Sequence, residues 1–179
     1  GDLSATIKAY WALKITGDDI DAHHMVTARN WILERGGAAN ANVFTRIMMA
    51  LFGQVPWRGV PVIPVEVMHL PRWFPFHMSK IAYWSRTVLT PLLILYAKKA
   101  QAQNPTGVNI KELFVTAPER HRKYQINPTG NFVGEVFLVI DKLLRFIEPA
   151  MPRGVRESAI RKAEAFTISH LNGESGLGA

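Results

Sequence analysis

Apolar residues along most of this chain recur at the three- and four-residue spacing of helices, and the period-two alternation of strands is nearly absent. Glycine follows the first three such stretches, as is common where a helix ends. Ser4 and Asn42 stand at the start of two of them and are expected to cap free N–H groups. The pattern therefore predicts helices over residues 4–16, 21–35 and 42–52.

A proline-rich passage between residues 53 and 77 interrupts this pattern. Proline at this density breaks regular helix, so we expect extended or turned backbone with one short helix around residues 65–70. A long helix is predicted from about residue 78 to residue 99, kinked or restarted near Pro91. Residues 100–130 are expected to form an irregular connection.

Two more helices are predicted in the last third, over about residues 132–148 and 155–171. The first is strongly amphipathic, because its five charged residues share about 140° of the helical wheel: Glu135, Asp141, Lys142, Arg145 and Glu148. Residues 28–37 and 163–173 form a faint repeat, in which an aromatic residue follows an alanine by three positions and a glycine ends the helix. The chain is therefore expected to be all-α, an array in which helical hairpins pack on their neighbours.

Composition agrees with one packed domain or a piece of one. Of the 179 residues 48% are hydrophobic, and the absence of cysteine excludes disulfides and thiolate metal sites. The net charge of +7 suggests an anionic partner such as a membrane surface or nucleic acid, although the basic residues are dispersed. The chain begins without Met or an apolar signal segment, so we expect residues 1–179 to be a single partial domain of a longer protein. No apolar run reaches the roughly 18 residues of a spanning helix, so a membrane would be met at its surface.

The segment "ITGDDIDAHHMV" gathers Asp18, Asp19, Asp21, His23 and His24. Such a cluster indicates either a metal or diphosphate site or the start of a helix. A magnesium site needs carboxylates one turn apart and partners on another helix, and the chain has no second acidic cluster. Adjacent histidines point in different directions and cannot chelate one ion together. We therefore predict that the aspartates cap the next helix and that the chain holds no metal.

Three segments, "GGAANANVFTRIMMALFGQVPW", "VPVIPVEVMHLPRWFPFHMSKIAYWSRTVLTPLLIL" and "NPTGVNIKELF", together resemble the bacterial squalene–hopene cyclases, which are class II triterpene cyclases. The passage "LPRWFPFH" followed by "YWSRT" is the most specific part of this resemblance. The resemblance implies an internal portion of a longer chain, part of the inserted α/α-barrel domain. It also implies proton-initiated cyclisation of squalene to hopene, with hopanol as a side product and with no cofactor.

The resemblance also implies roles for individual residues. Trp84 falls on the cavity-wall tryptophan of the family, and Phe44 lies close to the cavity, with ordinary core packing as the alternative for both. Ile81 and Leu89 fall where the family lines the constriction of the substrate channel, and packing explains apolar residues there equally well. The catalytic acid of the family lies in an Asp-x-Asp-Asp motif that is absent here, so no catalytic residue is expected in this chain and it should be inactive alone.

The predicted amphipathic helix matches the membrane-dipping segment of this monotopic family. Phe137, Leu144 and Ile147 would enter the acyl boundary while Lys142 and Arg145 stay near headgroups, and the alternative is that this stripe packs on the barrel. The basic run "ERHRKY" would add attraction to anionic lipid. The expected location is the cytoplasmic side of a bacterial membrane.

The expected partners are squalene, the membrane surface and the remainder of the same chain, with a homodimer left open and no nucleic acid. Two alternatives remain at this point. One is a related cyclase that acts on another polyprenyl substrate, and the other is a non-catalytic helical module that binds membranes or other proteins.

Overall fold

The computed structural model describes residues 1–75, 77–121, 124, 130–172 and 177–178. The chain divides into two compact units, one formed by residues 1–61 and 101–128 and the other by residues 62–100 and 129–179. That the chain forms one partial domain stays a prediction. Within the described residues the structure is helical apart from two strands of two residues each, so the predicted all-α class is confirmed.

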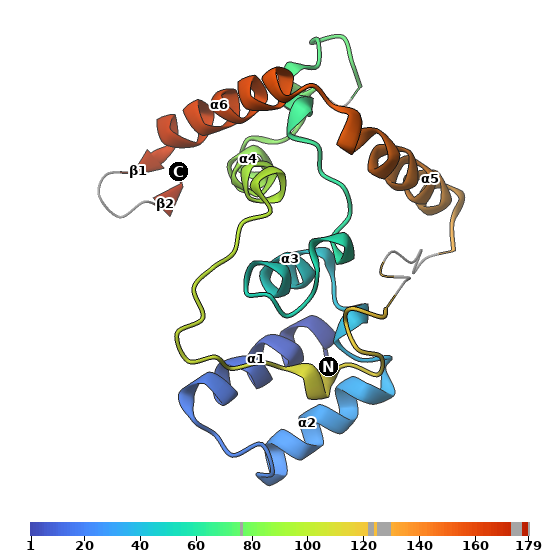
Figure 1. Cartoon of the computed structure of the whole chain (residues 1–179), viewed down its shortest axis with the longest axis vertical. Coiled ribbons are helices and arrows are strands. Elements are labelled where there is room, and N and C mark those ends of the chain that lie inside the picture. The colour runs from blue at the N-terminus through green and yellow to red at the C-terminus, as the bar shows by residue number, and fades with distance from the viewer. Residues whose placement is uncertain (76, 122–123, 125–129, 173–176, 179) are drawn as a thin grey trace. The chain divides into compact units, whose positions relative to one another are not determined.

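In its described residues the first unit contains three α-helices and three short 3₁₀ turns. They are α1 (Leu3–Thr16), α2 (His23–Glu34), η1 (Ala38–Asn40), α3 (Val43–Leu51), η2 (Trp57–Gly59) and η5 (Lys111–Leu113). Figure 1 labels the three helices. Helix α1 contacts α2 and η1, and α2 contacts η5, the turn that belongs to the predicted irregular connection. The largest side chains that these elements bury completely include Tyr10, Ile7, Met25 and Ile32.

The caps of the first unit agree only in part with the prediction. Asn42 caps α3 as predicted, because its side chain accepts a hydrogen bond of 2.9 Å from the Thr45 N–H. Ser4 is not the cap of α1: Asp2 accepts the bond from Ala5, and Ser4 is buried, where its hydroxyl accepts a bond from the Asn42 N–H. A serine two residues inside a helix can thus serve a neighbouring helix instead of its own.

The second unit places α4 (Tyr83–Lys98) beside α6 (Arg153–Ser169), as Figure 1 shows. Its other elements are η3 (Val65–His69), η4 (Met78–Lys80), α5 (Phe132–Ile147), η6 (Glu148–Ala150), β1 (Leu171–Asn172) and β2 (Leu177–Gly178), with β1 antiparallel to β2. The turn η3 packs against both α4 and α6. The hydrophobic core of this unit consists of Val65, Met68, Met78, Leu93, Ala159 and Ala163.

The predicted long helix over residues 78–99 is wrong at its start, and it does not restart near Pro91, whereas the predicted kink there stays a prediction. Ile81 and Ala82 have extended backbone, with ψ of 138° and 145°, so η4 ends before α4 begins. Helix α4 then continues through Pro91. Among the described residues no helix has both the length and the apolar character needed to cross a membrane.

Candidate functional site

The acidic cluster before α2 does not cap that helix. The N-cap residue is Ala22, and no side-chain hydrogen bond caps α2 there. Asp19 instead accepts a bond of 3.0 Å from the Asp21 N–H, and Asp18 lies 2.8 Å from His24. The predicted capping role of the aspartates is therefore wrong, since their described side-chain contacts go to other groups than the free N–H groups of α2.

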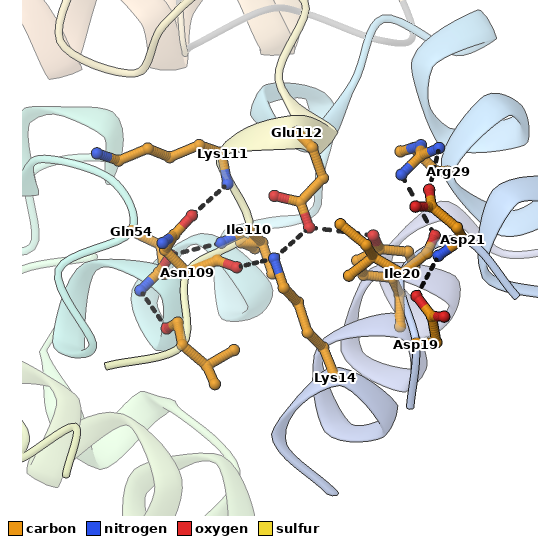
Figure 2. A network of polar contacts seen from close by, with 12 residues as sticks. Lys14, Asp19, Ile20, Asp21, Arg29, Gln54, Asn109, Ile110, Lys111 and Glu112 are labelled. Carbon is orange, nitrogen blue, oxygen red and sulfur yellow. Dashed lines mark hydrogen bonds and ion pairs between the residues drawn. The ribbon is translucent and has the colours of Figure 1, made fainter. Parts of the chain in front are cut away.

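The same segment is attached to α2 through Arg29. Its guanidinium lies 3.8 Å from the Asp21 carboxylate and donates to the Ile20 carbonyl, as Figure 2 shows. Within the part of the chain that the structure describes, no group of three His, Asp or Glu side chains is arranged to hold a metal ion. The cluster is a turn held by hydrogen bonds among its own residues and by Arg29 of α2.

A second polar network in the same unit joins α1 to η5 (Figure 2). Lys14 donates to the Glu112 carboxylate at 2.5 Å and to the Asn109 carbonyl at 2.7 Å, and the Tyr10 hydroxyl donates to Glu112 at 3.0 Å. Burial raises the pKa of Tyr10 to about 12. Burial alone would raise the pKa of Glu112, but the hydrogen bond from Lys14 holds it below its ordinary value. Glu112 is therefore a fixed carboxylate, which suits attachment and not proton donation.

Trp84 and Phe44, the two aromatic residues predicted to line a cavity, are both exposed in this chain. Trp84 is 71% exposed on α4 in the second unit, and Phe44 is 64% exposed on α3 in the first. Neither ring is packed in the core of this chain. Their role toward a substrate stays a prediction.

Ile81 and Leu89 lie apart from the exposed face of Trp84. Both are partly buried and pack against the hydrophobic core of the second unit. Leu89 follows Trp84 by five residues, which corresponds to about 140° around a helix. Val88 shares the side of Trp84, one turn later, and is 49% exposed. In the sequence, the four-residue spacing between Trp84 and Val88 indicates that both residues lie on the same face of the helix.

Helix α5 turns much of its charged side inward. The Asp141 carboxylate accepts a bond of 2.7 Å from the Val62 N–H and is paired with Arg145 at 2.8 Å. At the end of the helix the Glu148 carboxylate pairs with Lys99 at 3.0 Å and accepts a bond from the Tyr96 hydroxyl. Because these carboxylates find donors on the protein, the helix can be attached through polar contacts.

The opposite side of α5 is an exposed apolar stripe, which we call the outer stripe of α5: Phe132, Val136, Val139, Leu143 and Phe146. Its members follow one another by three or four residues, as neighbours on one helix face do. Of the residues predicted to contact a membrane, Phe137 is 56% exposed, whereas Leu144 and Ile147 are partly buried. The sequence pattern alone did not show which part of the apolar arc faces outward. In the basic run "ERHRKY", residues 122 and 123 lie outside the described residues.

The second unit also contains a cavity of about 280 Å³ next to its core. Its polar wall is formed by Arg72, His77, Ser79, Arg86 and Lys162, and its apolar wall by Met68, Met78 and Phe166. None of the four predicted cavity and channel residues lines it. Sequence reasoning missed this site because its residues come from four separate segments.

Comparison with known proteins identifies the family. The model of the squalene-hopene cyclase N-terminal domain matches residues 1–179. The chain is 50% identical to a probable squalene–hopene cyclase of Sinorhizobium fredii over 184 aligned residues, covering 99% of this chain and 28% of that protein. It is also 50% identical to the squalene–hopene cyclases of Bradyrhizobium diazoefficiens and Zymomonas mobilis, covering 99% of this chain and 27% of each.

The chain thus spans little more than a quarter of the length of these relatives. Their names agree with the resemblance carried by the sequence motifs, and the helical structure agrees with a part of an α/α barrel. The match covers both compact units. This chain belongs to the squalene–hopene cyclase family.

Proposed function

We propose that the full-length protein containing this chain cyclises squalene to hopene and hopanol by a proton-initiated carbocation cascade. The observation that carries this proposal is the match of the family model over all 179 residues, together with relatives that are named squalene–hopene cyclases at 50% identity. The Asp-x-Asp-Asp acid is absent from this sequence, so the proton must come from another part of the full-length protein.

The chemistry requires a dry, preformed wall beside the moving positive charge. Aromatic faces stabilise a cation by their quadrupole, with tryptophan the strongest of the three aromatic residues. Trp84 is available for this role because its ring does not fill the core of this chain. Phe44 is available for the same reason, and Ile81 and Leu89 would support the wall from within the core of the second unit.

The test is incubation of the full-length enzyme with squalene in detergent, followed by gas chromatography and mass spectrometry of the products. Trp84→Ala should lower the rate of hopene formation or release incompletely cyclised products, with little change in the melting temperature. Trp73→Ala removes a tryptophan that is 77% exposed and is the matched control. No conversion of squalene by the wild-type enzyme would refute the function, and wild-type products from Trp84→Ala would refute the role of the tryptophan. Residues 1–179 expressed alone should not convert squalene.

The proposal includes attachment to the membrane surface, from which a hydrocarbon substrate enters. The outer stripe of α5 supports this part, since its five apolar side chains are exposed while the carboxylates of Asp141 and Glu148 bind the protein. An apolar helix face bordered by charges is typical of helices that lie in the interfacial plane of a bilayer. Glu135 and Lys142 are both exposed at the border of the stripe.

A further inference from the structure

The cavity of the second unit carries positive charge without negative charge. Arg72, Arg86 and Lys162 line it together with His77, and no carboxylate does. Within the described residues none of these three cations forms an ion pair. Cations gathered around a cavity repel one another, so the arrangement favours an anionic occupant.

Among the described residues that line this cavity, one buried hydrogen-bond donor lacks an acceptor, and two other side chains can donate further. The Nε of Arg86 is buried and has no hydrogen-bond partner within the described chain, and a buried unpaired donor is costly. The Nδ1 of His77 accepts a bond of 3.0 Å from the Ser79 N–H, so its other ring nitrogen carries the proton and is a donor. The Lys162 ammonium donates to the Met68 carbonyl at 2.6 Å, which holds it at the rim with donors to spare.

Apart from Ser79, the remaining wall is apolar. Met68 and Met78 are buried members of the hydrophobic core, and Phe166 packs against that core. The ring of Phe166 is stacked on His170 at 4.1 Å between centroids, which fixes one side of the cavity. An occupant must therefore present both an anionic head and an apolar portion. Squalene, an uncharged hydrocarbon, does not fit this description, so the cavity is not a site for the proposed substrate.

We propose that this cavity binds a phosphate group carried on an apolar chain. A phosphate has the oxygens to accept from two guanidinium groups and an ammonium, and it carries enough charge to balance several cations. The apolar chain would lie against Met68, Met78 and Phe166. The ligand is an amphiphile, either a lipid of the bilayer or a soluble alkyl phosphate, and the inference does not depend on the cyclase activity.

The test is titration calorimetry of the full-length protein with octyl phosphate below its micellar concentration. We expect saturable binding at one site and a Kd about tenfold higher for Arg86→Gln and for Lys162→Gln, each of which removes a charged donor. Arg161 is the exposed sequence neighbour of Lys162 and does not line the cavity. Arg161→Gln should therefore leave the Kd for octyl phosphate within about twofold of the wild-type value. Lys162 is exposed, so its variant remains informative if Arg86→Gln fails to fold.

The source of the phosphate is read from sedimentation with vesicles. If a bilayer lipid supplies it, the wild-type protein should prefer phosphatidylglycerol over phosphatidylcholine vesicles, and Arg86→Gln and Lys162→Gln should lose more of this preference than Arg161→Gln does. If a soluble amphiphile supplies the phosphate, Arg86→Gln and Lys162→Gln should weaken the binding of octyl phosphate and leave the binding to vesicles unchanged. Equal Kd values for all three variants, equally tight binding of octanol, or no saturable binding would overturn the proposal. Squalene turnover measured alongside separates this outcome from failure of the cyclase proposal.

Discussion

Phe146 on the outer stripe of α5 offers the sharpest test of membrane attachment. Its side chain is 83% exposed, and burial of a phenylalanine side chain stabilises by about 1.5–3 kcal/mol. Scaled by the exposed fraction, Phe146→Ser should lose about 1.2–2.5 kcal/mol of membrane partitioning, which is roughly an 8- to 70-fold weaker partition coefficient. The folded state should be hardly affected, because little of this side chain is packed in the chain.

Ile147 is the comparison that distinguishes the structure from the sequence pattern. Both residues belong to the apolar arc of α5, but Ile147 is partly buried. Ile147→Ser should therefore weaken partitioning less than Phe146→Ser and lower the melting temperature more. The reverse order would mean that α5 is turned differently about its axis.

The assay is sedimentation of the full-length protein with phosphatidylcholine vesicles, whose headgroups carry no net charge, so that apolar contact dominates. Phe44→Ser is the matched control, since Phe44 is 64% exposed but lies on α3. If Phe146→Ser changed the partition coefficient by no more than about twofold, membrane contact through the outer stripe of α5 would be refuted, since transfer of that side chain alone predicts a larger loss. So would an equal loss for Phe44→Ser, because the effect would then follow general hydrophobicity.

Two further predictions concern the network of Figure 2. Glu112→Gln removes the charge that holds Lys14, at a cost of about 2 kcal/mol, so amide exchange at Leu113 and Phe114 in the full-length protein should be roughly thirtyfold faster. Glu119→Gln, an exposed carboxylate of the same connection, should leave these rates nearly unchanged, and faster exchange in both variants would contradict the prediction. The pKa of Tyr10 is about 12 against an ordinary 10, so the unfolded state loses this proton first and stability falls as pH rises from 10 to 12. By pH 11 Tyr10 should account for about 1 kcal/mol of the stability lost in urea unfolding. Burial also raises the pKa of Tyr96, so Tyr10→Phe should still lose stability as pH rises, but by about 1 kcal/mol less than the wild-type protein.

The parts of the fold that depend on neighbours in the sequence were predictable. The α5 helix spans Phe132–Ile147 against a predicted 132–148, because its periodicity is strong and Asn131 caps its first turn at 2.8 Å. Asn42 likewise caps α3, since a short polar side chain directly before an apolar stripe reaches the free N–H groups. The cap of α1 was misassigned, because which of Asp2 and Ser4 turns outward depends on Asn42, far away in the sequence.

The orientation of α5 could not be read from its own sequence. A helical wheel shows that the charges share one side, and the usual expectation is that this side meets water. In the structure Asp141 and Glu148 bind Val62 and Lys99, which lie 79 and 49 residues earlier in the chain. No pattern in the sequence of α5 indicates that Val62 and Lys99 supply these donors. The cavity around Arg86 escaped notice for the same reason, since Lys162 comes from another helix.

The apolar faces of α4 and α5 differ in one respect that bears on their use. From Thr87 to Ala97 the sequence of α4 contains no charged residue, whereas the outer stripe of α5 is bordered by exposed Glu135 and Lys142. A water-free wall suits the first face, and an interfacial plane, where charges stay hydrated, suits the second. Trp84→Ala should therefore change the products formed in detergent and leave vesicle partitioning intact, while Phe146→Ser should do the reverse. If both variants changed both properties, the two faces would serve one surface, and the separation into cavity wall and membrane contact would be wrong.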